Sequence, residues 1–215
     1  MGYQVAKLYV QYGCGQSAPC EWINFDASPT LRVQGMPVLG SILKSRLNTI
    51  FPKNVLYGDI IKGLPIKDNS CDGVYCSHIL EHLSLSDFKR ALVNTHRILK
   101  VGGIFRCVVP DLELAARKYI ANLDAGDNYA SINFLSDTSL GFLERPRKAV
   151  DFISSFLGNS RHLWMWDSAS LAEELRKAGF ANVRKCNFND CEDQMFKLVE
   201  DLSRFKSALA IECRK

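Results

Sequence analysis

The stretch Lys7-Leu8-Tyr9-Val10-Gln11-Tyr12-Gly13-Cys14-Gly15 decides the fold, because an apolar run there ends in a glycine turn. The run predicts a strand, and the glycines permit a tight turn and close approach of the backbone to a ligand. A second short strand, 22–26, ends at Asp26. By itself the glycine turn also fits an ordinary β-turn. Followed by an acidic residue at the end of the next strand, it is the arrangement with which an open α/β sheet holds a nucleoside.

Along the rest of the chain, short apolar runs alternate with segments whose apolar residues have helical spacing. This alternation is the pattern of βαβ units. The connections between the first five strands are long enough to cross over a parallel sheet. We therefore expect an α/β fold with one Rossmann-like, seven-stranded, mostly parallel sheet, helices on both faces and an antiparallel last strand. Strands are predicted at 7–12, 22–26, 55–59, 71–76, 104–109, 183–188 and 207–213, and helices at 39–50, from Ser86 to Gly102-Gly103, at 112–123, and from a capping box of Ser170 with Glu173 to Gly179.

Composition excludes several classes of protein. The 215 residues, 47% hydrophobic and 23% charged, support a single domain over 1–215 with a real core. The net charge of +4 is spread along the chain, so we expect no nucleic-acid partner. No apolar stretch reaches the roughly 18 residues of a membrane span. The N-terminus lacks the build of a signal peptide and the eight cysteines form no C-x-x-C pair, so we expect a reducing, cytoplasmic location.

The order of motifs resembles the class I S-adenosylmethionine-dependent methyltransferases, in particular the small type 11 group and a bacterial subset within it. Coverage is essentially complete, since 171–180 also looks like the last helix and turn of that family. The segments that carry the resemblance are Tyr9-Val10-Gln11-Tyr12-Gly13-Cys14-Gly15, Trp22-Ile23-Asn24-Phe25-Asp26, Gly58-Asp59-Ile60, Leu64-Pro65-Ile66-Lys67-Asp68-Asn69-Ser70-Cys71-Asp72-Gly73-Val74, Ser77-His78-Ile79-Leu80-Glu81-His82-Leu83 and Leu99-Lys100-Val101-Gly102-Gly103.

The resemblance implies S-adenosylmethionine as the cofactor. Gln11 stands where the family usually has an acid, so it would bind the cofactor's ammonium through its amide oxygen, and Ser17 replaces a frequent third glycine. Only ten residues separate Gly15 from Asp26, too few for the usual first helix, so the cofactor loop should be open. The family's other roles would fall on Gly13, Cys14 and Gly15 for the methionine part, Asp26 for the ribose, Asp59 and Ile60 for the adenine, and Ser77 and His78 for the sulfur side.

The segment His78-Ile79-Leu80-Glu81-His82 is open to three interpretations. It matches the H-x-x-E-H motif of zinc peptidases, but that motif needs a long helix and here the segment directly follows a strand. The family instead implies a hydrogen-bonded Glu81-His82 pair at the mouth of the site, without a metal and with His82 as a candidate base. A hydroxyl acceptor would benefit from a base, for which His82 and the distant His162 are the candidates. A related branch, the small-RNA 2′-O-methyltransferases, holds a divalent ion with a similar motif. The metal-assisted alternative would use His78, Glu81, His82 and His162.

Acceptor recognition is expected from 111–167, the least regular interval, as a substrate-facing insertion or lid. Trp164 and Trp166 either pack in the core or form a platform for a sugar ring. Arg147, in a basic loop, is either solvated or meets an acidic acceptor such as a nucleotide-sugar phosphate. A chain this short should have an open site, completed by this insertion or by a second copy in a homodimer.

The function these features predict is methyl transfer from S-adenosylmethionine, EC class 2.1.1, to a small-molecule or glycan-type acceptor, with O-methylation favoured. One alternative is a non-catalytic methyltransferase-like module that binds cofactor or a partner, which Gln11 and Ser17 weakly support. Another is a nicotinamide-dependent oxidoreductase, which shares the glycine turn and acid but not Asp59 and the segment 64–70.

Overall fold

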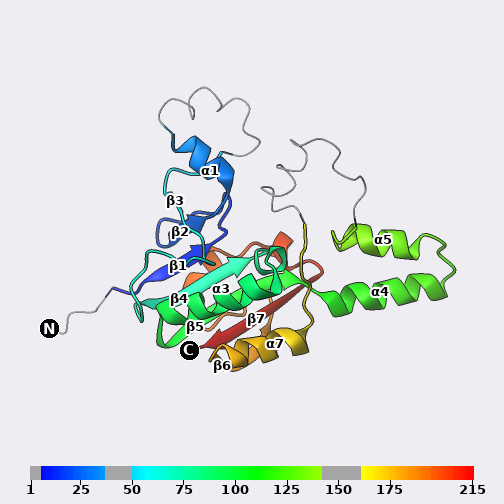
Figure 1. Ribbon diagram of the computed structural model, residues 1–215. Coiled ribbons are helices and arrows are strands. Elements are labelled where there is room, and N and C mark those ends of the chain that lie inside the picture. Colours follow the sequence, from blue (N-terminus) through cyan, green and yellow to red (C-terminus); the bar gives the residue numbers. More distant parts are fainter. Residues whose placement is uncertain (1–5, 37–49, 142–160) are drawn as a thin grey trace.

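The computed structural model describes residues 6–36, 50–141 and 161–215. Its seven strands form one sheet in the order β3-β2-β1-β4-β5-β7-β6 (Figure 1). The pairs among β1 to β5 are parallel, and β7 runs antiparallel between β5 and β6, which confirms the predicted sheet and its antiparallel last strand. The strands are β1 (Tyr9–Tyr12), β2 (Ile23–Asp26), β3 (Val55–Tyr57), β4 (Cys71–Ser77), β5 (Leu99–Pro110), β6 (Ala181–Cys186) and β7 (Ala208–Arg214).

The strand order reverses between β1 and β4. On one side of β1 lie β2 and β3, and on its other side lie β4 and β5. Parallel strands bring their carboxyl ends to one edge, and the reversal leaves a crevice there in which open α/β sheets bind ligands. The glycine turn after β1 and the residues after β4 therefore face each other at this edge.

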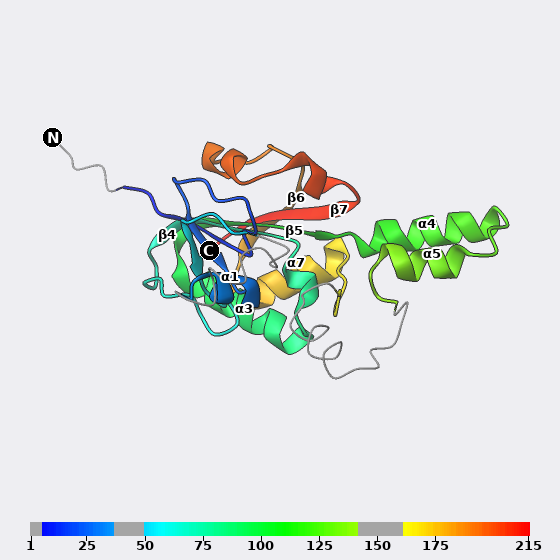
Figure 2. The same ribbon diagram turned by 90° about the horizontal axis from the view of Figure 1, so that it is seen from above.

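Two different layers cover the sheet (Figure 2). One face carries α3 (Leu85–Ile98) and α7 (Ser168–Lys177), which bury Phe88 and Leu171 in the main core. The other face is covered by the chain between β6 and β7, which contains the 3-10 helices η3 (Gln194–Leu198) and η4 (Leu202–Phe205). Phe196 of η3 packs there against Trp22, with ring centroids 5.4 Å apart. Short 3-10 helices thus take the place of α-helices on this face.

A helical hairpin projects beyond the sheet after β5. It consists of α4 (Leu112–Asp124) and α5 (Ala130–Asp137), which lie side by side in both ribbon views (Figures 1 and 2). The rings of Tyr119 and Phe134 meet between them at 5.5 Å. The predicted helix 112–123 is confirmed, whereas α5 lies in a stretch whose Asn, Asp and Ser residues hid its helical period. The remaining helices are α1 (Pro29–Gln34) and the 3-10 helix η2 (Leu80–His82).

Local capping corrects several predicted boundaries. Ser84, not Ser86, caps α3, because its Oγ accepts the Asp87 N–H at 3.2 Å. The helix ends at Ile98, since Leu99 already pairs with Cys71 and begins β5, which places Gly102-Gly103 inside a strand. Asp167 replaces the predicted capping box of α7 and accepts the Ser170 N–H at 2.8 Å. The strands β3, β5, β6 and β7 also begin or end a few residues from their predicted limits. The predicted helix 39–50 lies outside the described residues except for its last residue.

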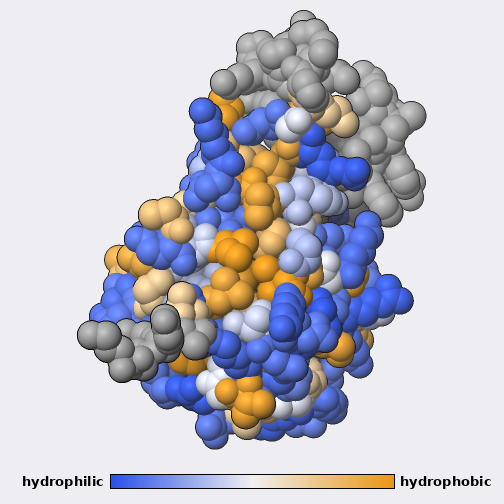
Figure 3. All heavy atoms as spheres, turned by 90° about the vertical axis from the view of Figure 1, so that its left-hand side faces the viewer, coloured by the Kyte–Doolittle hydropathy of each residue, from blue (hydrophilic) through white to orange (hydrophobic). Residues whose placement is uncertain are grey.

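The outer surface near β3 is partly apolar. As the edge strand of the sheet, β3 leaves Leu56 51% exposed. Figure 3 looks onto the side of the molecule that carries β3 and α1, where apolar side chains form a strip between polar ones. In the described part of the chain, no helix combines the length and apolar character that crossing a membrane requires.

Arg106 of β5 is a fully buried cation, and we expect its loss to destabilise the fold strongly. Its guanidinium contacts Glu200, Glu212 and Asp190. Replacing one partner of a buried ion pair leaves a buried charge uncompensated, here that of Glu200, which costs about 3–5 kcal/mol. Arg106→Met should lower the free energy of unfolding in urea by that amount. Arg117→Met, which removes an exposed pair with Glu113 within α4, should cost less than about 1 kcal/mol. Equal losses in the two variants would contradict this role.

Candidate functional site

Asp26 ties the glycine turn to the end of β2. Its carboxylate accepts the Gly15 N–H at 3.0 Å and the Ser28 N–H at 2.8 Å. Gly13 and Gly15 have φ values of +66° and +55°, which favour glycine. A Cβ at Gly15 would meet no atom within 4 Å, so the turn has open space beside it. The residues proposed from the sequence for the methionine and ribose parts of a cofactor therefore lie together.

The connection between β1 and β2 contains no helix, as its length predicts. It is held by Gln11, which is 2% exposed and whose Nε2 donates to the Ser17 carbonyl at 2.7 Å and to Asn24 Oδ1. Both amide hydrogens are thereby used inside the protein, and no described residue donates to the amide oxygen. Gln11 thus offers an acceptor, which is the group that an ammonium needs. Asn24, which orients it, was not singled out from the sequence.

Two of the predicted cofactor residues bury their side chains. Cys14 packs in a small core with Leu31 and Phe51, and burial, followed by the nearby Asp26, raises the pKa of its thiol to about 12. Ile60 is 5% exposed in the main core, and its carbonyl accepts from Asn94 Nδ2 at 2.8 Å. Both can therefore contact a ligand only through their backbone. Asp59 keeps a partly exposed carboxylate, whose Oδ1 accepts the Ile61 N–H at 3.0 Å.

The residues after β4 reach the glycine turn through Ile79. A Cβ at Gly13 would lie 2.0 Å from the Cδ1 of Ile79, so this side chain fills the space above the turn. Ser77, which ends β4, is partly buried. His78 has φ +54°, donates from Nε2 to the Arg204 carbonyl at 2.9 Å, and holds Nδ1 3.2 Å from Glu81 Oε1. Burial lowers the pKa of His78, but Glu81 and the Arg204 carbonyl outweigh it and raise the pKa above its ordinary value.

Glu81, His82 and His162 form a compact cluster, here called the histidine-carboxylate cluster. One ligand atom from each residue lies within 4.8 Å of the others. The Glu81 side chain is fully buried; its Oε1 pairs with His78 Nδ1 at 3.2 Å, and its Oε2 has no hydrogen-bond partner among the described residues. His82 Nε2 lies 3.9 Å from Glu81 Oε1, and the His82 and His162 rings meet at 5.2 Å. His78, paired with Glu81, is not part of this group.

Backbone hydrogen bonds bring the distant His162 to this place. The carbonyl of Glu81 accepts the N–H groups of Leu163 at 2.7 Å and Trp164 at 3.1 Å. His82 Nδ1 donates to the Arg161 carbonyl at 2.6 Å, so its Nε2 keeps the lone pair of the neutral ring. Burial is the main cause of the lowered pKa of His162, whose ring is therefore neutral near pH 7. An imidazole in its neutral form can accept a proton or bind a metal ion, and two imidazoles lie here beside a carboxylate.

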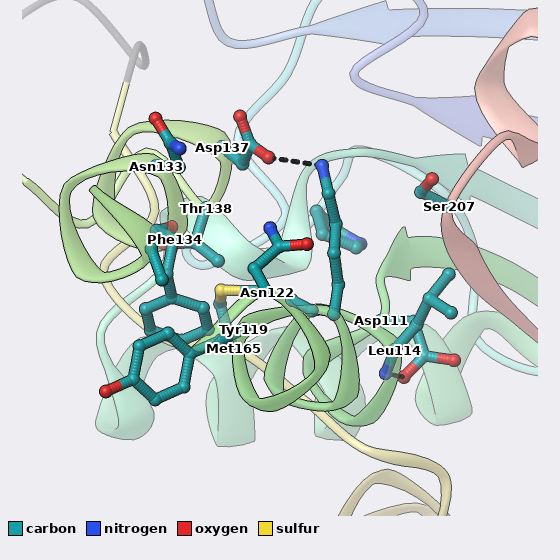
Figure 4. A pocket seen from close by; sticks show the side chains of 14 residues that line it. Asp111, Leu114, Tyr119, Asn122, Asn133, Phe134, Asp137, Thr138, Met165 and Ser207 are labelled. Atoms are coloured by element: carbon teal, nitrogen blue, oxygen red, sulfur yellow. Dashed lines mark hydrogen bonds and ion pairs between the residues drawn. The ribbon is translucent and has the colours of Figure 1, made fainter. Parts of the chain in front are cut away.

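A pocket of about 280 Å³ opens next to the cluster, between the base of the α4–α5 hairpin and Met165 (Figure 4). The rings of Tyr119 and Phe134 form an apolar wall, and Lys118 Nζ pairs with Asp137 at 2.7 Å across the opening. Thr138 also lines the pocket, and its backbone contacts His162. The sequence indicated this region only as the interval 111–167. None of these lining residues was singled out in advance.

The two tryptophans of the predicted platform differ in their exposure to solvent. Trp166 is 2% exposed and stacks on Phe88 with ring centroids 4.1 Å apart, so it belongs to the core and presents no free face to an acceptor. Trp164 is 41% exposed. Arg147 lies outside the described residues.

Known proteins are similar to this chain, one family in its N-terminal part and the solved structures along nearly all of it. The model of a family described as a methyltransferase domain matches residues 10–107, from β1 into β5. A solved S-adenosylmethionine-dependent methyltransferase from Thermotoga maritima is similar, with TM-score 0.50, 20% identity, and coverage of 97% of this chain and 82% of that one. Another from Mesorhizobium loti has TM-score 0.50, 19% identity, and coverage of 98% and 91%. At these identities the structures show a shared fold. A search of curated proteins found no match.

The contact between Gly13 and Ile79 predicts a severe effect of a methyl group at the turn. Gly13→Ala places a Cβ 2.0 Å from Ile79 Cδ1 at a φ of +66°, so strain and overlap add. Gly126→Ala is the matched control, because its φ of +83° is equally unfavourable but no atom lies within 4 Å. Strain alone costs about 1–2 kcal/mol. Thermal unfolding should show a clearly larger loss for Gly13→Ala, and similar losses would mean that Ile79 moves freely.

Proposed function

We propose that this chain is an S-adenosylmethionine-dependent methyltransferase of the type 11 family and that it transfers the methyl group to a hydroxyl of a small-molecule or glycan-type acceptor. The observation that carries the proposal is the position of the histidine-carboxylate cluster between the glycine turn and the pocket beside α4. Ile79 contacts Gly13 on one side, and Thr138 joins His162 to the pocket on the other. A proton acceptor at this place serves a hydroxyl, whereas a neutral amine needs none.

The residues at the carboxyl edge fit the cofactor. Asp26 would hold the ribose hydroxyls, Gln11 would accept from the ammonium, and Asp59 with the Ile60 N–H would meet the adenine. The backbone of 13–15 would line the methionine part, and Ser77 with His78 would close the sulfur side. When bound, S-adenosylmethionine supplies a methyl group attached to a good leaving group, so positioning in a dry pocket accounts for most of the catalysis.

The interval 111–167 would form the acceptor wall of a single catalytic domain. The aromatic side chains of Tyr119 and Phe134 suit the apolar face of a sugar ring or a similar acceptor, and Lys118 with Asp137 can hydrogen-bond its hydroxyls. This wall lies outside the segment that matches the methyltransferase family, so it can differ from one family member to another. Trp164 and Arg147 remain predicted acceptor contacts.

Within the cluster, His82 is the first candidate base. Its Nδ1–H is held by the Arg161 carbonyl, which leaves Nε2 to take the acceptor's proton, and the Glu81 carboxylate stabilises the imidazolium that results. His162, also neutral, is the second candidate. A homodimer that completes the acceptor wall and a cytoplasmic location stay predictions from the sequence. The eight cysteines are all free, which supports a reducing compartment.

Measuring S-adenosylmethionine binding tests the cofactor assignment. Asp26→Ala removes the carboxylate that faces the ribose and also frees Gly15, so S-adenosylmethionine affinity in titration calorimetry should fall by about tenfold or more. Asp124→Ala, at the exposed end of α4, is the control and should bind like the wild type. Unchanged affinity in Asp26→Ala, or thermal stabilisation by nicotinamide nucleotides alone, would overturn the cofactor assignment.

Turnover tests the proposed chemistry. The assay would measure S-adenosylhomocysteine release with a panel of sugars, nucleotide sugars and small alcohols, beside matched amines. His82→Ala should lower turnover by about 100-fold while S-adenosylmethionine affinity stays unchanged, because proton transfer, not binding, is lost. His96→Ala, in α3, is the control. Activity on amines alone would sink O-methylation, and cofactor binding without turnover on any acceptor would favour the non-catalytic module.

A further inference from the structure

We infer that Glu81, His82 and His162 bind a divalent first-row transition-metal ion. Their ligand atoms lie within 4.8 Å of one another, and they come from two segments of the chain about 80 residues apart. Two imidazole nitrogens with one carboxylate oxygen are a donor set that such ions prefer over Mg²⁺ or Ca²⁺, which favour oxygen ligands. The role of the ion in methyl transfer rests on the proposed function. Ion binding itself does not.

The state of Glu81 is the independent observation that points to a cation. Its side chain is fully buried, and Oε2 makes no hydrogen bond or ion pair with a described residue. A buried carboxylate left in this way is costly unless a cation or hydrogen-bond donors compensate it. His78 approaches Oε1 at 3.2 Å, which leaves Oε2 for a ligand. An ion bound by this oxygen would satisfy the group that the protein leaves unsatisfied.

Both histidines have free nitrogens for this purpose. His82 Nδ1 donates to the Arg161 carbonyl, the outer hydrogen bond by which metal-binding histidines are commonly oriented, so Nε2 presents its lone pair toward Glu81. Nδ1 of His162 is buried and makes no hydrogen bond with the described residues. A tetrahedral ion about 2.1 Å from its ligands holds them about 3.4 Å apart, so the cluster must contract on binding. The His162 ring, unrestrained at Nδ1, can turn to close the gap.

Three protein ligands leave at least one coordination position open. The cluster lies beside the pocket through the contact of Thr138 with His162, so a water molecule or a hydroxyl oxygen of the acceptor can take that position. A metal-bound hydroxyl is more acidic than a free one. With an ion bound, His82 and His162 would act as its ligands, and the proton lost by the acceptor hydroxyl would pass to water in the pocket. The base role proposed for His82 would then apply only to the chain without the ion.

The experiment is a titration of chelator-treated full-length protein with Co²⁺, whose visible absorption reports its coordination geometry, followed by competition with Zn²⁺ and with Mg²⁺. We expect one Co²⁺ per chain, displaced by Zn²⁺ and not by a similar concentration of Mg²⁺. Glu81→Gln and His162→Asn should each weaken Co²⁺ binding by about 100-fold or more. His96→Asn removes a histidine outside the cluster and should leave binding unchanged.

Thermal unfolding without metal shows whether each variant folds. His162 is only partly buried, so His162→Asn keeps the test valid even if Glu81→Gln unfolds. Absence of Co²⁺ binding, equal binding in His162→Asn and His96→Asn, or displacement by Mg²⁺ at a similar concentration would overturn the inference. S-adenosylmethionine affinity, measured on the same samples without metal, reports on the cofactor assignment separately. A failed metal site and a failed methyltransferase are therefore distinguishable.

Discussion

The parallel pairing of β1 with β4 is the constraint on which the site depends. The two strands are neighbours in the sheet although 58 residues separate the end of one from the start of the other. Their carboxyl ends must then lie side by side, and the chain leaves them toward different partners because the strand order reverses there. Gly13, the first residue past this edge after β1, and Ile79, the second residue after β4, consequently touch. The glycine turn, η2 and the histidine-carboxylate cluster all take their positions from this contact.

The buried polar groups differ in whether the protein itself supplies their hydrogen-bond or ion-pair partners. Arg106 is surrounded by three carboxylates, and Gln11 uses both of its amide hydrogens. These groups hold the sheet and the cofactor loop in one arrangement. The Glu81 carboxylate lacks such hydrogen bonds, and so does Nδ1 of His162. Because unsatisfied buried polar groups are costly, the Glu81 carboxylate and His162 Nδ1, which lie together in one cluster, mark the place where we propose that the protein meets another molecule.

Local signals in the sequence were sufficient for the sheet and for the glycine turn with its acidic partner. Each strand is a short apolar run bounded by turn residues, and Asp26 directly follows such a run. The ten residues between Gly15 and Asp26 also excluded a helix, and none is present. Helix caps were less predictable. Ser84 and Ser86 at the start of α3, and Asp167 and Ser170 at the start of α7, are all residue types that cap helices, and the backbone geometry decides which one does. The polar sequence of α5 concealed a helix that is stabilised by its packing on α4.

The sequence by itself determined the succession of strands along the chain and the glycine turn with its acidic partner. It also determined the residue types available for proton transfer or metal binding. These depend on contacts between residues close together in the chain. The tertiary structure alone decided that His162 lies beside Glu81 and His82, that Trp166 is buried while Trp164 is exposed, and that α4 and α5 enclose a pocket. Those outcomes depend on backbone hydrogen bonds such as those from Leu163 and Trp164 to the Glu81 carbonyl. The spacing of residues in the sequence cannot predict such hydrogen bonds. They join segments that are distant in the chain and form only after the sheet has brought these segments together.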